Sequence, residues 1–266
     1  MSKQVAIVFA LTFVIHLIST LSYALRIAGV RTKRIALSFA LFNVIVIASR
    51  TANAFQAPLL AKHVEQNILE NNRTHAESDF RWLLLAAALA TVVGGLLIPT
   101  FQRLFTRAIE AFNAHRSVPR LLLSGLSPSR LRQFRHVAAM PAPENLHGLS
   151  LRQAPTKILF FNVLMTALIT VGVFASLYAG YLNPQLRLTA NSMSPVINGF
   201  STVLLFAFID PYLAVLTDDV VMGKTSEAYF RKCVRLFVLS RLAGTALAQL
   251  IFVPSAKFVI FVADKL

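Results

Sequence analysis

Long stretches without a Lys, Arg, Asp or Glu residue constrain the fold of this chain more than any other feature of its sequence. Four such stretches cover residues 4–25, 82–102, 158–186 and 188–209. An α-helix needs about 20 apolar residues to cross the hydrocarbon core of a bilayer, and each stretch has that length. Two more apolar stretches, 35–61 and 236–263, contain charged residues. We therefore expect six helices that cross a membrane.

Composition supports a membrane protein and excludes several other classes. Of the 266 residues, 56% are hydrophobic and 14% are charged, whereas soluble domains have about 25% charged residues. The single cysteine, Cys233, excludes a disulfide framework and a thiolate zinc site. No nucleotide-binding, hydrolase or metalloprotease motif is present, so we expect no catalytic residue, metal or cofactor. A net charge of +15 also suits a nucleic-acid-binding protein, but a mean hydropathy of +0.64 favours anionic membrane lipids as the partner instead.

The sequence thus predicts an all-α fold, a polytopic integral membrane helical bundle that forms one membrane domain over residues 1–266. The six predicted spans cover about residues 4–25, 35–61, 82–102, 158–182, 193–216 and 236–263. The loops after the first, third and fifth spans hold 17 Lys and Arg residues, and the opposite segments hold 6. Because cytoplasmic loops are enriched in these residues, we place the loop 99–157 in the cytoplasm and both termini outside.

The basic loop 99–157 begins with an amphipathic helical pattern. Its apolar residues recur on one helical face, at Phe101, Leu104, Phe105, Ala108 and Phe112. A second apolar and basic stretch covers residues 121–134. We expect one or two interfacial helices on the anionic inner leaflet, and the alternative is a solvated connector.

Ionisable residues inside the predicted spans mark candidate functional positions, because each costs about 2.5–3.5 kcal/mol to insert. Arg50 shares one helical face with Asn43 and Asn53, and the planar guanidinium of an arginine suits a phosphate group. The alternative is that Arg50 pairs with an acid for structural reasons. Arg241 shares a face with Gln249, and the alternative for Arg241 is snorkelling to the cytoplasmic interface.

Acidic and histidine residues extend this set. Asp210 precedes Pro211, which predicts a broken helix of the kind that forms transporter sites. A salt bridge from Asp210 to Arg50 or Arg241 is the alternative, and for Asp218 the alternative is a solvated helix end. His16 is alone in its span, where it either handles protons or packs as a hydrogen-bonded residue.

Small residues repeated every four positions predict close helix crossings. Gly172, Ser176 and Gly180 form one such face, and Ser240, Gly244 and Ala248 form another. The first face contacts a helix of the same chain or of a homodimer partner, and we favour a contact within the chain.

Three segments within the first 60 residues resemble the Amj family of bacterial lipid II flippases: YALRIAGVRT (23–32), FNV (42–44) and SRTANAFQAPLL (49–60). DPYLA (210–214) and residues 241–249 are similar to the same family, and the likeness extends over essentially the whole chain. The resemblance implies a multi-pass protein of the bacterial cytoplasmic membrane, an alternate to the MurJ flippases. Such a protein translocates undecaprenyl-pyrophosphate-linked disaccharide-pentapeptide, lipid II, to the outer leaflet for cell-wall synthesis.

A lipid-linked pyrophosphate needs cations in apolar surroundings, and the residues above supply them. The expected substrate-binding residues are Arg50, Arg241, Asn43, Asn53, Gln56 and Gln249, and the expected charge-coupling residues are Asp210, Asp218 and His16. Transport without a nucleotide motif is downhill or driven by an ion gradient or the membrane potential. Two alternatives stay open: an integral membrane enzyme acting on polyprenyl phosphates through Asp218, Asp219 and His63 or His147, and a small-solute secondary transporter.

The distribution of Lys and Arg generates a topological prediction. In a Cys233→Ser background, an impermeant maleimide added outside intact cells should label Lys265→Cys and leave Arg130→Cys unmodified. Labelling of Arg130→Cys without labelling of Lys265→Cys would show the opposite orientation.

Overall fold

The structure is a computed structural model that describes residues 2–70, 76–115, 138–139 and 154–266. The described residues form helices and no strand. The helices are α1 (Lys3–Thr32), α2 (Ile35–Leu69), α3 (Ala76–His115), α7 (Thr156–Leu182), α8 (Arg187–Ser192), α9 (Ser194–Leu204), α10 (Asp210–Val221) and α11 (Glu227–Ala263). A 3₁₀ turn at Pro184–Leu186 precedes α8, and a π-helical segment at Leu205–Ile209 joins α9 to α10.

Six helical runs are long and apolar enough to cross a membrane, as the sequence predicted. These runs are α1, α2, α3, α7, the run Pro184–Val221 and α11. The chain is therefore a multi-pass membrane protein. The first helix is longer than the predicted span 4–25, because α1 continues to Thr32 and ends only where Lys33 adopts a left-handed conformation. Arg26, which the sequence placed in the following loop, is therefore a helical residue.

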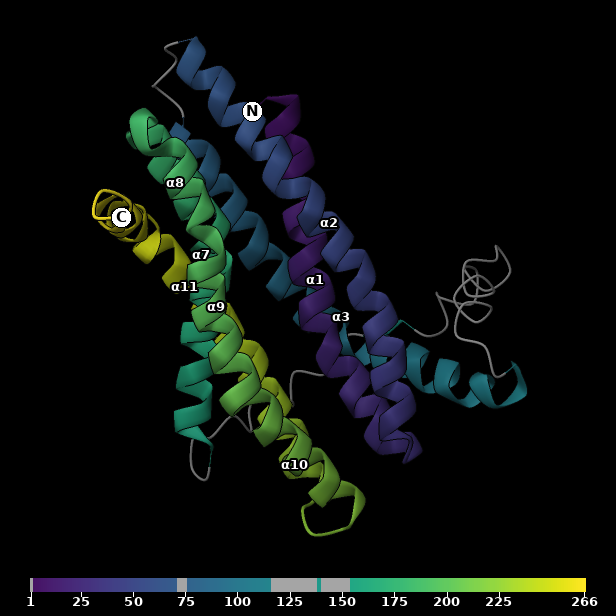
Figure 1. The fold of residues 1–266 in the computed structure, drawn as a ribbon. Helices are drawn as coiled ribbons and strands as arrows, with labels where there is room; N and C mark the ends of the chain where they lie inside the picture. The colour runs from purple at the N-terminus through teal and green to yellow at the C-terminus, as the bar shows by residue number, and fades with distance from the viewer. Residues whose placement is uncertain (1, 71–75, 116–137, 140–153) are drawn as a thin grey trace.

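The helices form two groups that lie side by side (Figure 1). In the first group α1 packs against both α2 and α3, and in the second α7 packs against α9 and α11. A tight turn joins α1 to α2, where Lys33 adopts a left-handed conformation with φ of 55° and its N–H bonds the carbonyl oxygens of Gly29 and Val30. Below, "basic end" means the end of the bundle with this turn and the α10–α11 turn, and "terminal end" means the end nearer both termini.

An aromatic cluster packs three helices together toward the terminal end. Phe80 of α3 lies 5.5 Å from Tyr178 of α7 and 5.6 Å from Phe252 of α11, measured between ring centroids. Phe174 of α7 completes the cluster at 6.3 Å from Phe80. Phe80 and Phe252 are fully buried, so this cluster is the central hydrophobic contact between the two helix groups.

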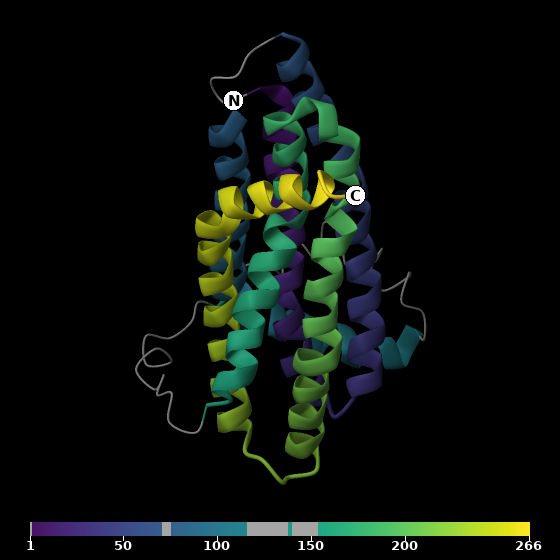
Figure 2. The same cartoon turned by 60° about the vertical axis from the view of Figure 1, so that its left-hand side comes forward.

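Prolines inside two of the long helices accompany changes of direction. A proline removes one intrahelical hydrogen bond and bends the helix. The part of α3 that follows Pro99 leaves the bundle sideways (Figure 1), and the part of α11 that follows Pro254 crosses the bundle (Figure 2).

The sideways part of α3 contains the amphipathic pattern predicted at 101–112, which is confirmed as helical. Ile109 is fully buried in a cluster with Leu25 and Leu41, whereas Arg103 and Arg107 are exposed. This segment therefore packs part of its apolar face on α1 and α2. The predicted second stretch, 121–134, lies outside the described residues.

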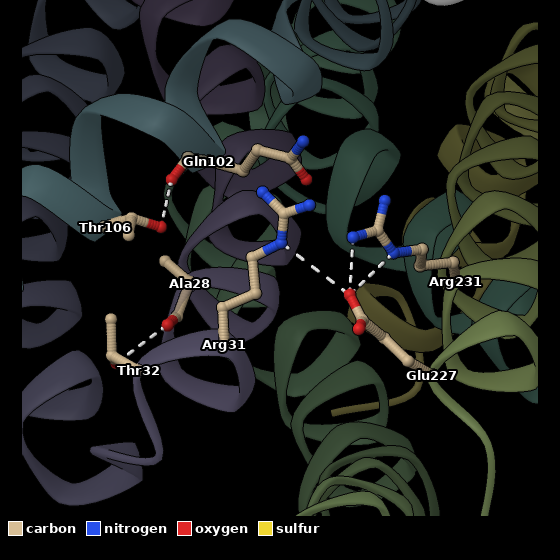
Figure 3. A network of polar contacts seen from close by, with 7 residues as sticks. All are labelled: Ala28, Arg31, Thr32, Gln102, Thr106, Glu227 and Arg231. Atoms are coloured by element: carbon tan, nitrogen blue, oxygen red, sulfur yellow. Dashed lines mark hydrogen bonds and ion pairs between the residues drawn. The ribbon is translucent and has the colours of Figure 1, made fainter.

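An ion cluster links α1 to α11 at the basic end (Figure 3). The Nε atom of Arg31 lies 3.6 Å from Oε1 of Glu227, and Arg231 donates to the same carboxylate oxygen. Figure 3 also shows Gln102 of α3 beside Arg31. These three charged side chains are more than a third exposed, so each pair stabilises the fold by at most about 1 kcal/mol.

Glycines permit close crossings at the predicted positions, and the contacts lie within the chain. A Cβ atom at Gly172 of α7 would collide with the side-chain oxygen of Asn198 in α9. At Gly244 of α11 it would lie 2.6 Å from the backbone oxygen of Val163 in α7. The predicted small-residue faces are therefore confirmed at both glycines.

These contacts predict that Gly244→Ala destabilises the fold. The backbone oxygen of Val163 cannot move aside as a side chain can, so we expect a loss of about 1–3 kcal/mol, seen as a lower Tm in detergent. Gly199→Ala is the matched control, because nothing lies within 4 Å of a Cβ atom at Gly199 and alanine favours helix. Equal Tm values for the two variants would contradict the close crossing.

Candidate functional site

An ion pair between the two helix groups is the centre of the candidate site. Nη2 of Arg26 in α1 donates to Oδ1 of Asp210 in α10 over 2.7 Å. The Arg26 side chain is 13% exposed and that of Asp210 is 36% exposed. The salt bridge considered for Asp210 with Arg50 or Arg241 is wrong, because the partner is Arg26.

Local helix geometry explains how Asp210 reaches this position. Pro211 has no N–H group, so the preceding turn cannot close in the usual α-helical way. The N–H of Asp210 instead donates to the carbonyl oxygen of Leu205, five residues earlier, which makes a π-helical turn. The helix break predicted at Asp210-Pro211 is therefore a widened turn in a continuous helical run. Such turns often occur at functional sites.

Arg26 also lines a small pocket between α1 and α2. Its guanidinium carbon lies 5.0 Å from the centroid of the Phe39 ring, a cation–π distance. The pocket is lined by Ser22, Leu25, Arg26, Ser38, Phe39 and Phe42. Nη1 of Arg26 is buried and has no hydrogen-bond partner among the described residues. The guanidinium thus retains free donors beside its contact with Asp210.

A second guanidinium, that of Arg241 in α11, is buried nearby. The side chain is 7% exposed, so the alternative that it snorkels to the interface is wrong. Its charge acts on His16 and Tyr23 of α1, and Tyr23 is also within range of the charges of Arg26 and Asp210. Within the described part of the chain, Nε of Arg241 and Nδ1 of His16 have no hydrogen-bond partner.

Asn162 of α7 borders the same region. Its side-chain nitrogen donates to Oγ of Ser240 over 2.7 Å and to the carbonyl oxygen of Phe237 over 3.1 Å. Its side-chain oxygen is buried without a partner among the residues described, and Tyr23 lies close by. The region therefore contains two guanidinium groups and one carboxylate, an arrangement that favours an anionic ligand.

Two predicted site residues hold helices together instead of facing this region. Nε2 of Gln56 in α2 donates to Oγ1 of Thr12 in α1 over 2.9 Å, and both side chains are buried. Nε2 of Gln249 in α11 donates to the carbonyl oxygen of Arg81 in α3 over 3.0 Å, and Arg81 donates back to the carbonyl oxygen of Gln249. Both amides thus have structural partners.

Three other residues predicted to bind substrate are exposed. Asn43, Arg50 and Asn53 lie on the surface of α2, so Arg50 is not enclosed with the buried Arg241. Phe39, Asn43 and Arg50 are spaced four and seven residues apart, which places the last two on the face of α2 that also bears Phe39. Substrate contact by these residues stays a prediction.

The acid and histidine residues considered for an enzyme lie at opposite ends of the bundle. Asp218 is exposed near the end of α10, at the basic end, which agrees with a solvated helix end. His63 lies at the terminal end, where its Nε2 is 3.0 Å from Oδ2 of Asp79. His147 lies outside the described residues. No three metal-ligating side chains in the described ranges could hold a metal ion.

Arg26 is the site residue that sequence reasoning missed. The available signal was the spacing of Tyr23 and Arg26, three residues apart, and the absence of proline from residues 27–34, where Gly29 alone does not end a helix. This pattern allows the helix to continue past Arg26 and places both side chains on one face.

Comparison with known proteins identifies similar sequences. The family model described as "Amj: Alternate to MurJ" matches residues 11–263. The protein named "Lipid II flippase Amj" from Bacillus subtilis (strain 168) is 37% identical over 259 residues, which are 97% of this chain and 96% of that protein. No solved structure matches the chain.

The Arg26–Asp210 pair generates a prediction about stability. In a double-mutant cycle of Arg26→Gln and Asp210→Asn, measured by unfolding in detergent, we expect a coupling energy of about 1–3 kcal/mol. The matched cycle of Arg231→Gln and Glu227→Gln, at the exposed pair, should give less than about 1 kcal/mol. A coupling for Arg26 and Asp210 no larger than that of the exposed pair would show that their contact does not stabilise the fold.

Proposed function

We propose that this chain, which belongs to the Amj (alternate to MurJ) family, is a lipid II flippase of the bacterial cytoplasmic membrane. It moves undecaprenyl-pyrophosphate-linked peptidoglycan precursor from the inner to the outer leaflet for cell-wall synthesis. The nearly full-length similarity to a protein with that name supports this function, and so do the six helices long enough to span a membrane. The reaction is transport, without chemical change of the lipid.

The buried charges between the helix groups are the observation that carries the proposal. A pyrophosphate headgroup is strongly hydrated, and moving it through hydrocarbon without a counter-charge is prohibitively costly. Arg26 and Arg241 supply two guanidinium groups in the bundle, against the single carboxylate of Asp210. The resulting excess of positive charge compensates the anionic headgroup during its passage.

The exposed face of α2 continues the route of the headgroup from Arg26 toward the terminal end. Asn43 and Arg50 follow Phe39 on one helical face, and Arg50 lies about 16 Å from Phe39 along the helix axis, at 1.5 Å per residue. Asn53, also exposed, lies less than one turn beyond Arg50. These polar side chains contact the headgroup as it moves, while the prenyl tail stays in the lipid.

We assign charge coupling to the ionisable residues beside the route of the headgroup. Asp210 changes partner when the anion arrives, and His16 is buried next to Arg241 with one ring nitrogen unused among the described residues. Asp218, two turns beyond Asp210, lies at the basic end. An ion gradient or the membrane potential drives the cycle through these groups.

Transport in vesicles tests the proposal directly. Purified full-length chain in proteoliposomes should exchange fluorescent lipid II between leaflets, and the recovered lipid should be unchanged. Arg26→Ala and Arg241→Ala should each slow the exchange by about tenfold or more, the effect of a barrier raised by about 1.4 kcal/mol.

The matched control is Arg107→Ala, which removes an exposed arginine from the sideways part of α3. It should exchange lipid II at the parental rate. Chemically altered lipid would indicate an enzyme, and parental exchange by folded Arg26→Ala and Arg241→Ala would contradict the cationic path.

A further inference from the structure

We infer that the pocket between α1 and α2 is a binding site for the pyrophosphate group of polyprenyl-linked lipids. The carboxylate of Asp210 stays bound to the guanidinium of Arg26 until such a pyrophosphate displaces it. This inference rests on the proposed function and deepens it by assigning the residues that recognise the headgroup. The pocket is lined by Arg26, two serines and two phenylalanines, together with Leu25.

The guanidinium of Arg26 has the donors that this exchange needs. A guanidinium carries five N–H donors in a planar fork and binds phosphate oxygens in pairs. In the structure Nη2 bonds Asp210, whereas Nη1 is buried and makes no hydrogen bond with any described residue. The Phe39 ring, 5.0 Å away, holds the guanidinium without using a donor. A phosphate group entering the pocket would thus meet an arginine that is already positioned.

Two hydroxyl groups on the pocket wall complete the site. Oγ of Ser22 donates to the carbonyl oxygen of Ser19 over 2.8 Å, and Oγ of Ser38 donates to that of Ile35, also over 2.8 Å. Rotation about one side-chain bond redirects either hydroxyl to a phosphate oxygen. Because the carbonyl groups they leave are also bonded within their helices, this change costs little.

Asp210 is placed to leave because protein does not enclose it. Its side chain is 36% exposed, so the released carboxylate can turn away from Arg26 without displacing another helix. The incoming phosphate takes over the neutralisation of Arg26, so the buried guanidinium has a counter-charge before and after the exchange. The two anions therefore compete for one cation, and Asp210 lowers the apparent affinity for the lipid while keeping the empty site folded.

Depth and size identify the part of the lipid that is recognised. Arg26 lies six residues before the end of α1, about 9 Å along the helix axis from the basic end, which the distribution of Lys and Arg predicts to be cytoplasmic. In that orientation the phosphates of an inner-leaflet lipid lie within reach of Arg26. The pocket itself encloses about 10 Å³, room for about one water molecule, so its side chains must move apart to admit a phosphate group. The sugar and peptide are far larger and stay outside, so the group recognised is the pyrophosphate.

Equilibrium binding in detergent micelles tests this exchange with two probes that share one tail. Undecaprenyl pyrophosphate should bind the parental full-length chain, and undecaprenol, which lacks the phosphates, should bind at least about tenfold more weakly. Asp210→Asn should bind undecaprenyl pyrophosphate about tenfold more tightly, because the competing carboxylate is gone. Arg26→Lys should bind it about tenfold more weakly, because lysine keeps the charge but lacks the planar fork.

Glu110→Gln is the matched control for Asp210→Asn, because it also removes one carboxylate but at an exposed position of α3. Its affinity should equal that of the parental chain. If Asp210→Asn does not fold, the double variant Arg26→Gln with Asp210→Asn keeps a neutral hydrogen-bonding pair and should bind both probes equally weakly. Parental affinity in Asp210→Asn, or unchanged preference for the pyrophosphate in the double variant, would overturn the inference.

The two proposals fail separately. If the parental chain exchanges lipid II, but the substitutions at Asp210 and Arg26 do not change its affinity for undecaprenyl pyrophosphate, the chain is a flippase with its binding site elsewhere. A chain that shows the expected affinities but no exchange of lipid II has the binding site without the proposed transport.

Discussion

A guanidinium cannot remain unpaired inside an apolar bundle, and this constraint decides how the two helix groups of this protein meet. Arg26 belongs to the first group and Asp210 to the second, so neutralising the arginine also holds α10 against α1. The carboxylate reaches across because Pro211 forces a widened turn just before it. The proposed anion site and a structural contact thus share one ion pair, and an anion that binds Arg26 would compete with a contact between the two helix groups.

Part of the unused hydrogen-bonding capacity of the described residues lies around this contact. A buried polar atom without a partner among the described residues occurs in each of four side chains: Arg26, Arg241, His16 and Asn162. Tyr23 lies near three of them, Arg26, Arg241 and Asn162. Folded proteins normally satisfy such groups, so each of them requires a reason. The anion of our proposal would satisfy the donors of Arg26 and Arg241 with its acceptor oxygens, whereas the unpartnered atom of Asn162 is an oxygen and needs a donor.

The sequence predicted the features that depend on local composition. It identified six spans, an amphipathic segment after the third, and close crossings at Gly172 and Gly244, because hydropathy, periodicity and side-chain size determine these features directly. It did not predict the partner of Asp210, since a loop boundary drawn at residue 25 removed Arg26 from the helix. Nor did it predict that Gln56 and Gln249 bond neighbouring helices, because an amide inside a span serves a substrate or a backbone equally well.

The ion pair that joins α1 to α11 and the aromatic cluster that joins α3 to α7 and α11 respond differently to dissolved salt. The side chains of Arg31, Glu227 and Arg231 at the basic end are partly exposed, so added salt weakens their attraction as the Debye length falls from about 8 Å under physiological conditions to about 3 Å at 1 M. Phe80, Tyr178 and Phe252 toward the terminal end cohere through ring packing, which salt hardly changes. Raising the salt concentration therefore weakens the ionic link between α1 and α11 and leaves the aromatic cluster intact, so salt separates these two contributions to helix packing without a substitution.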